Sequence, residues 1–210
     1  MKQKKPNAFF YRFMRMFFRI AFTLYNRCSV KWLEDLKPGE RFVVACNHCS
    51  NLDPILIGSF FPRPLRYFAK EELFHSWFLR TAITALGAVP VSRVDNATAA
   101  SALKSFMKLY REGSDVLIFP EGGRSLDGRL QPLEAGVALI ASHENAPILP
   151  AYIRGSFEAM PPGATFVKPV RISVTFGKPL RFGPEVYKKR GSREVIMGEL
   201  TAAMKALESA

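Results

Sequence analysis

The 210-residue chain contains only three cysteines and none of the common nucleotide-binding or hydrolase motifs. Cys28, Cys46 and Cys49 offer no disulfide framework and no paired CxxC zinc spacing, and they fit a reducing, cytosolic setting. The patterns GxxxxGK[ST] and GxGxxG are absent, so nothing indicates ATP or a dinucleotide. GxSxG and HExxH are absent too, which argues against an acyl-serine intermediate and a zinc protease site. We predict no cofactor and no metal.

Acidic residues are absent before Glu34, whereas eight basic residues precede it. The net charge is +12, so most of the basic excess lies at the N-terminus. A hydrophobic content of 48% over this length is enough for one α/β domain with a buried core. A basic excess indicates either nucleic acid or an anionic membrane as partner, and the residues between the charges distinguish the two.

Aromatic side chains fill the space between the N-terminal arginines. On a helix, one apolar stripe and one basic stripe are expected, the first made of Phe10, Met14, Phe17, Ala21 and Leu24 and the second of Lys5, Arg12, Arg15 and Arg19. Arginines interrupt every window long enough to span a bilayer, and no signal-peptide cleavage site follows. We therefore predict that residues 1–35 form a helical segment lying in an anionic membrane surface, followed by a catalytic domain at 36–210. A helix docked on the protein's own core is the alternative, and nucleic acid is not favoured.

Beyond residue 36, short apolar runs alternate with helical patterns, which predicts a largely parallel sheet flanked by helices in a single α/β domain. The expected strands are Phe42–Cys46, Leu65–Ala69, Ala88–Val91, Val116–Phe119, Ile148–Ile153 and Arg171–Phe176. The expected helices are Ile55–Phe60, Glu71–Ala85, Ala97–Arg111, Leu133–His143 and Arg193–Leu207, the last with Ser192 as its cap.

One turn combines a histidine and an aspartate. His48 follows the first of these strands, and Asp53-Pro54 has the form of a helix start with the aspartate at the N-cap. In a turn, Asp53 could accept the Nδ1–H of His48 and leave Nε2 free to take a proton from a hydroxyl. A capping aspartate beside a backbone-bonded histidine is the simpler interpretation.

Three further strands end in arginine or in a glycine-rich loop. The residues that follow these strands are Arg93, the segment Glu121-Gly122-Gly123-Arg124, and Arg154. We expect them at the carboxyl ends of the strands, where α/β sheets bind their ligands. The glycines permit close backbone approach to an anion, and arginine binds a phosphate bidentately. Together with His48 they predict a base beside a phosphate pocket.

In four ordered blocks the chain resembles the glycerolipid acyltransferases of the 1-acylglycerol-3-phosphate acyltransferase type, known by their HxxxxD signature. The blocks are His48–Asp53, Gly87–Arg93, Phe119–Ser125 and Leu149–Ile153. The resemblance implies transfer of an acyl group from acyl-CoA or acyl carrier protein to a lysolipid hydroxyl, at the cytoplasmic face of the inner membrane. Two departures are visible: Gly123 stands where threonine is usual, and Glu134 stands near Gly136 where lysine is common.

Carried over to this chain, the resemblance makes His48 the general base and Asp53 its orienting partner. Arg93, Glu121, Gly122, Gly123 and Arg124 would bind the acceptor, with Lys70 as a further substrate-binding residue. The hydroxyl would attack the thioester directly, without a covalent enzyme intermediate. Another lysophospholipid or a lyso-aminolipid as acceptor, and a catalytically idle membrane-binding protein, are the alternatives.

Overall fold

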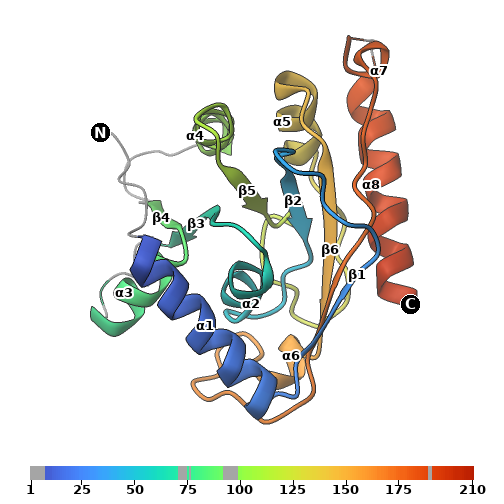
Figure 1. Ribbon diagram of the computed structural model, residues 1–210. Coiled ribbons are helices and arrows are strands. Elements are labelled where there is room, and N and C mark those ends of the chain that lie inside the picture. Colours follow the sequence, from blue (N-terminus) through green and yellow to red (C-terminus); the bar gives the residue numbers. More distant parts are fainter. Residues whose placement is uncertain (1–7, 71–74, 76, 92–98, 189–190) are drawn as a thin grey trace.

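A seven-stranded sheet forms the centre of the computed structural model, which describes residues 8–70, 75, 77–91, 99–188 and 191–210 (Figure 1). In spatial order its strands are β1 (Ser29–Trp32), β7 (Ser173–Phe176), β6 (Ile148–Arg154), β2 (Val43–Cys46), β5 (Asp115–Ile118), β3 (Leu65–Lys70) and β4 (Ala88–Val91). The five adjacent strands from β6 to β4 run parallel to one another, whereas β6 and β7 pair antiparallel. The predicted α/β domain with a largely parallel sheet is confirmed.

Helices cover both faces of this sheet (Figure 1). They are α1 (Ala8–Tyr25), α2 (Asp53–Phe60), α3 (Trp77–Ala85), α4 (Ala99–Arg111), α5 (Gly136–Glu144), α6 (Ser156–Ala159), α7 (Pro184–Lys188) and α8 (Ser192–Ser209). Successive residues of a strand point to opposite faces, so β2 serves two cores. Val44 packs in the core that includes α2, and Val43 packs in the core that includes α4, α5 and α8.

Three short elements, β1, α6 and α7, were not predicted, and several predicted boundaries were wrong. The helix expected from Leu133 begins only at Gly136, because the backbone N–H of Glu134 donates to Pro120 O at 2.7 Å and draws this segment to the preceding loop. Ser192 is the first residue of α8 rather than its cap, which is Gly191 in a left-handed conformation. The expected helix starts at 71 and 97 lie outside the described residues.

The first helix packs on the protein through side chains that coincide only in part with the predicted apolar stripe. Tyr11, Met14 and Phe22 are buried, and Phe18 packs beside them against α2 and the sheet. A second row of apolar side chains on α1 is exposed, made of Phe9, Phe13, Met16, Phe17, Ile20 and Leu24. The single predicted stripe therefore mixes the two environments, because an aromatic-rich helix offers more than one apolar face. No helix in the described part of the chain is long and apolar enough to cross a bilayer.

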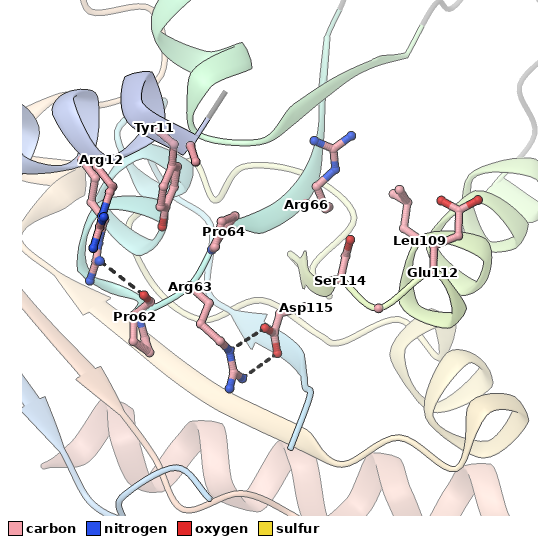
Figure 2. A pocket seen from close by; sticks show the side chains of 13 residues that line it. Tyr11, Arg12, Pro62, Arg63, Pro64, Arg66, Leu109, Glu112, Ser114 and Asp115 are labelled. Carbon is pink, nitrogen blue, oxygen red and sulfur yellow. Dashed lines mark hydrogen bonds and ion pairs between the residues drawn. The ribbon is translucent and has the colours of Figure 1, made fainter. Parts of the chain in front are cut away.

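An ion pair fixes the amino ends of two neighbouring strands (Figure 2). Arg63, just before β3, donates to both carboxylate oxygens of Asp115, the first residue of β5, at 2.9 and 3.0 Å. Asp115 also accepts the backbone N–H of Phe42 at 2.8 Å. Burial raises the pKa of Asp115, and the hydrogen bond from Arg63 opposes that rise. Strands β2, β3 and β5 are thus aligned from their amino ends, which sets where their carboxyl ends meet.

Candidate functional site

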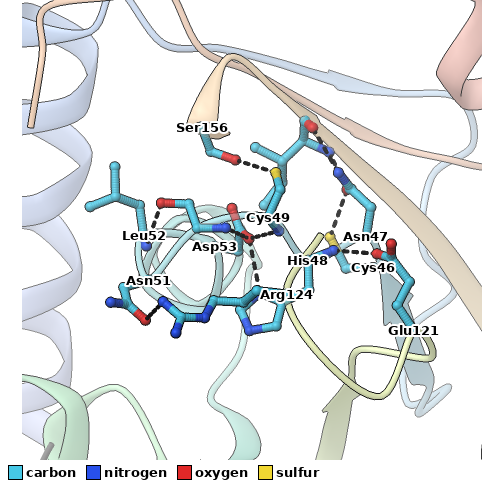
Figure 3. A network of polar contacts seen from close by, with 12 residues as sticks. Cys46, Asn47, His48, Cys49, Asn51, Leu52, Asp53, Glu121, Arg124 and Ser156 are labelled. Carbon is cyan, nitrogen blue, oxygen red and sulfur yellow. Dashed lines mark hydrogen bonds and ion pairs between the residues drawn. The ribbon is translucent and has the colours of Figure 1, made fainter. Parts of the chain in front are cut away.

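His48 and Asp53 meet in the turn between β2 and α2, as the spacing predicted (Figure 3). Nδ1 of His48 lies 2.9 Å from Oδ2 of Asp53. The Asp53 side chain is fully buried, whereas 19% of the His48 side chain is exposed. A buried carboxylate that accepts Nδ1–H fixes the tautomer of the ring and leaves Nε2 available on the open side.

Asp53 organises the turn rather than capping the helix. It is the first residue of α2, and the same Oδ2 atom accepts the backbone N–H groups of Cys49 and Ser50, each at 2.7 Å. The predicted N-cap role is wrong, because Asp53 reaches backward into the turn, not forward along the helix. Its Oδ1 is buried and has no hydrogen-bond partner among the described residues. One carboxylate oxygen thus holds both the turn and the imidazole.

The loop after β5 is fastened to this turn by two backbone contacts. The N–H of His48 donates to Oε1 of Glu121 at 2.5 Å, and the N–H of Ser125 donates to the carbonyl oxygen of His48 at 2.7 Å. The second oxygen of Glu121 accepts the N–H of Gln131 at 2.8 Å. Burial raises the pKa of Glu121, and its two backbone donors oppose that rise. Glu121, predicted as a substrate ligand, therefore has both oxygens in contact with the protein's own backbone.

The imidazole of His48 is in stacking contact with an aromatic ring, that of Phe119. Phe119 stacks on His48 with ring centroids 4.0 Å apart and an angle of 20° between the rings. This contact fixes the ring plane, while the Asp53 hydrogen bond fixes its rotation. His48 is thereby preorganised before any substrate arrives.

His48 and Arg124 line one cleft of about 710 Å³. Most of its remaining wall is apolar and comes from β3, α4 and β5, with Phe68, Ala69, Ala102, Leu103, Phe106, Leu117, Ile118 and Phe119 among its residues. At one side, Nη1 of Arg124 donates to Oδ1 of Asn51 at 3.0 Å, and Figure 3 shows its side chain beside the His48 ring. The cleft therefore joins a base, a cation and a long apolar wall.

Gly122 and Glu134 lie against each other in the loop that carries Arg124. Gly122 has φ +70°, and a Cβ atom there would come within 2.3 Å of a carboxylate oxygen of Glu134. The left-handed backbone favours glycine at this position, and any larger side chain would also displace the flexible end of Glu134. Apart from its chain neighbours, no described residue has an atom within 4 Å of the position that a Cβ on Gly123 would occupy. Glu134 itself is exposed and lines the cleft.

Of the remaining predicted site residues, the structure shows the side-chain contacts of Arg154 only. Arg154 turns away from the cleft and donates to the carbonyl oxygens of Leu207 and Glu208 at the end of α8, so its predicted place in a phosphate pocket is wrong. The reason is that carbonyl groups at a helix C-terminus attract a cation. Lys70 is the last residue of β3. Arg93 lies outside the described residues.

Asn47 is a further residue beside the site, and it was not among the predicted site residues. It is buried, its Nδ2 donates to Ile153 O at 3.0 Å, and its Oδ1 accepts the N–H of Ile153 at 2.7 Å. This pair of contacts ties the end of β2 to β6 next to His48. An asparagine placed directly after a fully apolar strand was the available signal, since a buried amide needs backbone partners.

The chemistry that this arrangement supports is proton abstraction from a neutral hydroxyl. An imidazole held by a buried carboxylate takes a proton well near neutral pH. Nucleophilic attack by Cys49 is disfavoured, because burial and the neighbouring Asp53 raise the pKa of its thiol to about 12. Arg124 offers a cation to an anionic group of the same substrate.

Comparison with known proteins gives consistent matches. The sequence model of the acyltransferase family matches residues 27–154. The 1-acyl-sn-glycerol-3-phosphate acyltransferase of Bacillus subtilis is 29% identical over 95% of this chain and 97% of its own length. A chloroplastic 1-acyl-sn-glycerol-3-phosphate acyltransferase of Brassica napus is 31% identical over 67% of this chain but only 41% of its own length.

A solved structure shares the fold. The crystal structure of the 1-acyl-sn-glycerophosphate acyltransferase of Thermotoga maritima superposes with a TM-score of 0.75 and 24% identity. The match covers 95% of this chain and 80% of that chain. The sheet and its helical layers thus correspond to a known architecture.

Proposed function

Because the chain belongs to the acyltransferase family, as its four sequence blocks predicted, we propose that it transfers a fatty acyl group from a thioester to the free hydroxyl of 1-acylglycerol 3-phosphate, giving phosphatidic acid. The observation that carries this proposal is the His48–Asp53 pair at 2.9 Å, facing a cleft that also holds Arg124. The donor is proposed to be acyl-CoA or an acyl carrier protein.

Nε2 of His48 removes the proton of the acceptor hydroxyl while its oxygen attacks the thioester carbonyl carbon. The imidazolium that forms is stabilised by Asp53, whose Oδ2 lies 2.9 Å from Nδ1. Backbone N–H groups or a nearby cation meet the oxyanion of the tetrahedral intermediate. Its collapse breaks the carbon–sulfur bond, and the departing thiolate takes the proton back from His48. The enzyme returns to its initial state without a covalent intermediate.

The cleft is lined by two kinds of side chain that match the two ends of such substrates. The apolar wall contributed by Phe68, Leu103 and Phe106 suits a fatty chain. Arg124, which lines the same cleft as His48, suits the phosphate of the acceptor. A hydroxyl carried between a chain and a phosphate would then lie at the imidazole.

Helix α1 is proposed to hold the enzyme on the membrane that contains the acceptor. Its outward row of apolar side chains, which includes Phe9, Phe13 and Phe17, is exposed although large, and Arg12 and Arg19 flank it. Exposed aromatic groups beside arginines suit the boundary between acyl chains and lipid phosphates. A peripheral position at the cytoplasmic face of the inner membrane follows if the thioester donor is cytosolic.

A lyso-aminolipid is the second candidate acceptor, because Glu134 places an exposed carboxylate in the cleft beside Gly122. An ammonium headgroup would pair with this carboxylate, and a phosphomonoester would be repelled by it. Replacing Glu134 with Lys should therefore raise the preference for 1-acylglycerol 3-phosphate.

The deciding experiment measures thiol release from acyl-CoA and from acyl carrier protein, with a panel of lysolipids as acceptors. We expect release to be fastest with 1-acylglycerol 3-phosphate and to vanish in His48→Ala. Faster release with a lyso-aminolipid would make that lipid the acceptor. No release with any acceptor would leave a membrane-binding protein and refute the proposed activity.

A further inference from the structure

An arginine-lined pocket of about 570 Å³ lies at the amino ends of the strands (Figure 2). His48 lies at the other end of the sheet. His48 follows the carboxyl end of β2, whereas this pocket lies at the amino ends of β3 and β5, where Asp115 is paired with Leu65. Its cations come from helix α1, from the segment that leads into β3 and from the start of β3, and they are Arg12, Arg15, Arg63 and Arg66. The proposed acyl transfer uses none of these residues.

A buried hydroxyl in the wall of this pocket has no hydrogen-bond partner among the described residues. It belongs to Tyr11, which is only 5% exposed. Burial raises the pKa of Tyr11, so the hydroxyl remains a neutral donor. Figure 2 shows its oxygen directed away from α1, into the space bounded by Pro64 and the arginines. Buried polar groups are nearly always hydrogen-bonded, so this unpaired donor at a pocket wall suits a ligand with an acceptor oxygen.

The charges facing the pocket favour an anion. Four guanidinium groups face two carboxylates, and one of these, Asp115, is already held by Arg63 at 2.9 Å. The other, Glu112, is exposed and pairs with Lys108 at 4.0 Å. Nε and Nη1 of Arg15 donate to the carbonyl oxygens of Ser59 and Pro62 at 3.0 and 3.3 Å, and burial lowers the pKa of this guanidinium. No carboxylate among the described residues forms an ion pair with Arg15, so a bound anion would balance its charge.

The pocket continues into the membrane-facing side of α1. Arg12 and Arg15 line both the pocket and the shallow hollow beside the exposed side chains of Phe9, Phe13 and Met16. A ligand with an anionic head and apolar chains could place its head among the arginines and its chains along α1. Free phosphate could bind the arginines but would leave the apolar side chains of α1 without a partner.

We propose that this pocket binds the phosphate group of a membrane phospholipid, as an anchoring site separate from the catalytic cleft. Tyr11 donates its hydroxyl to a phosphate oxygen, and Arg12 and Arg15 supply charge-assisted hydrogen bonds. The assignment of this phosphate to a lipid headgroup rests on the proposed function, in which α1 lies at the membrane surface. Thiol release, which tests the proposed activity, is a separate measurement and can fail or succeed independently.

The decisive variant is Tyr11→Phe, which leaves charge and shape unchanged and removes only the unpaired hydroxyl. Partition of the whole protein is measured on phosphatidylcholine vesicles with and without 20% phosphatidylglycerol, in an Arg124→Ala background that removes the cation of the catalytic cleft. We expect the variant to bind the anionic vesicles at least threefold more weakly than its parent and the neutral vesicles equally well. Its thermal midpoint should be the same or higher, since an unsatisfied buried group is removed. Equal binding of parent and variant to the anionic vesicles would overturn the proposal.

A matched pair of charge variants separates the pocket from general attraction to an anionic surface. Arg12→Gln and Arg19→Gln each remove one charge from α1, but only Arg12 lines the pocket. We expect Arg12→Gln to cost at least threefold more binding than Arg19→Gln, and equal losses would contradict a defined site. Titration with inorganic phosphate identifies the source of the anion. Tyr11-dependent binding of free phosphate, together with vesicle binding that does not depend on Tyr11, would refute the lipid headgroup.

Discussion

Glu121 accepts the backbone N–H of His48 at 2.5 Å, so the loop after β5 holds the turn that carries the imidazole. The other carboxylate oxygen of Glu121 is occupied by the N–H of Gln131. Because both of its oxygens accept backbone N–H groups, Glu121 is a positioning residue that affects the reaction through His48. This interpretation differs from a direct contact with the acceptor, and kinetics can distinguish the two.

Replacing Glu121 with Ala is expected to lower kcat at least tenfold and to change KM for the acceptor less than threefold. The physical reason is that two backbone donors lose a charged acceptor, which costs about 3 kcal/mol and lets the turn move. Steady-state kinetics with varied acceptor, together with a thermal melt, checks this. Glu121→Gln, which keeps one acceptor oxygen, should recover part of kcat. A large rise in KM at unchanged kcat would instead support a substrate ligand.

Replacing His48 with Ala is expected to lower kcat by about 10²- to 10⁴-fold, the usual contribution of a general base. Because 19% of the His48 side chain is exposed and its backbone makes the loop contacts, the fold should persist. Thiol release and circular dichroism measure the two effects. Asp53→Asn tests the partner, and it should reduce kcat as well as stability, since the Oδ2 that it alters also accepts two backbone N–H groups. Unchanged turnover in either variant would contradict the proposed general-base role of His48 and Asp53.

The sequence was sufficient to predict the sheet and the meeting of His48 with Asp53. Both depend on local information, namely short apolar runs between helical patterns and a five-residue spacing inside one turn. The contact between Glu121 and His48 was not predictable in this way. It joins residues 73 positions apart through a backbone N–H, and the sequence says nothing about which backbone group a carboxylate will meet.

Two wrong predictions have the same physical origin. Arg154 was expected at the cleft, but the C-terminal carbonyl groups of α8 compete for its guanidinium. The apolar stripe of α1 was expected as one surface, but α2, the end of α3 and the sheet core together bury Tyr11, Met14 and Phe22 and leave the Phe13 and Phe17 side outside. In each case the outcome depends on an element distant in sequence whose position only the fold supplies.

The three thiols are expected to resist alkylation at pH 8 in the native protein. Burial raises the pKa of Cys28 to about 11 and that of Cys49 to about 12, and it raises the pKa of Cys46 well above the ordinary value. Since the thiolate is the reactive form, native labelling should be slow, whereas denaturant should expose three reactive thiols. Titration with a colorimetric disulfide reagent measures both. Rapid native labelling of Cys49 would reopen a role for it as nucleophile.

The same raised pKa values predict a loss of stability at alkaline pH. In the unfolded chain these thiols ionise near pH 9, whereas in the folded chain the pKa is about 11 for Cys28 and about 12 for Cys49. Their contribution to the free energy of unfolding is therefore complete below about pH 9 and declines as the pH rises through that interval. Thermal midpoints measured between pH 7 and pH 11 should fall above pH 9, and a Cys49→Ala variant should show a smaller fall. A pH-independent midpoint would contradict the burial of these groups.

Replacing Arg124 with Ala is expected to raise KM for 1-acylglycerol 3-phosphate about tenfold or more. A charge-assisted contact with phosphate contributes about 1.5–3 kcal/mol, and 1.4 kcal/mol corresponds to one factor of ten. An uncharged monoacylglycerol acceptor should be affected little, because it has no phosphate to lose. Arg129→Ala is the matched control, since Arg129 is exposed on the same loop but does not line the cleft. Equal losses with both acceptors would assign Arg124 to the structure of the loop instead.

The membrane role of α1 is best tested without deleting the helix, because removing it would uncover the core that Tyr11, Met14 and Phe22 fill. Replacing Phe13 and Phe17 with Gln changes only exposed side chains, 53% and 49% accessible, and should leave the thermal midpoint within a few degrees. Each buried aromatic ring contributes about 1.5–3 kcal/mol to transfer from water, so vesicle binding should fall more than tenfold. Val195→Gln, an equally exposed apolar position on α8, is the control and should bind as the parent does. If the Phe13 and Phe17 variant binds vesicles as strongly as the Val195 variant, α1 only completes the core of the domain, and another surface must bring the cleft to its lipid substrate.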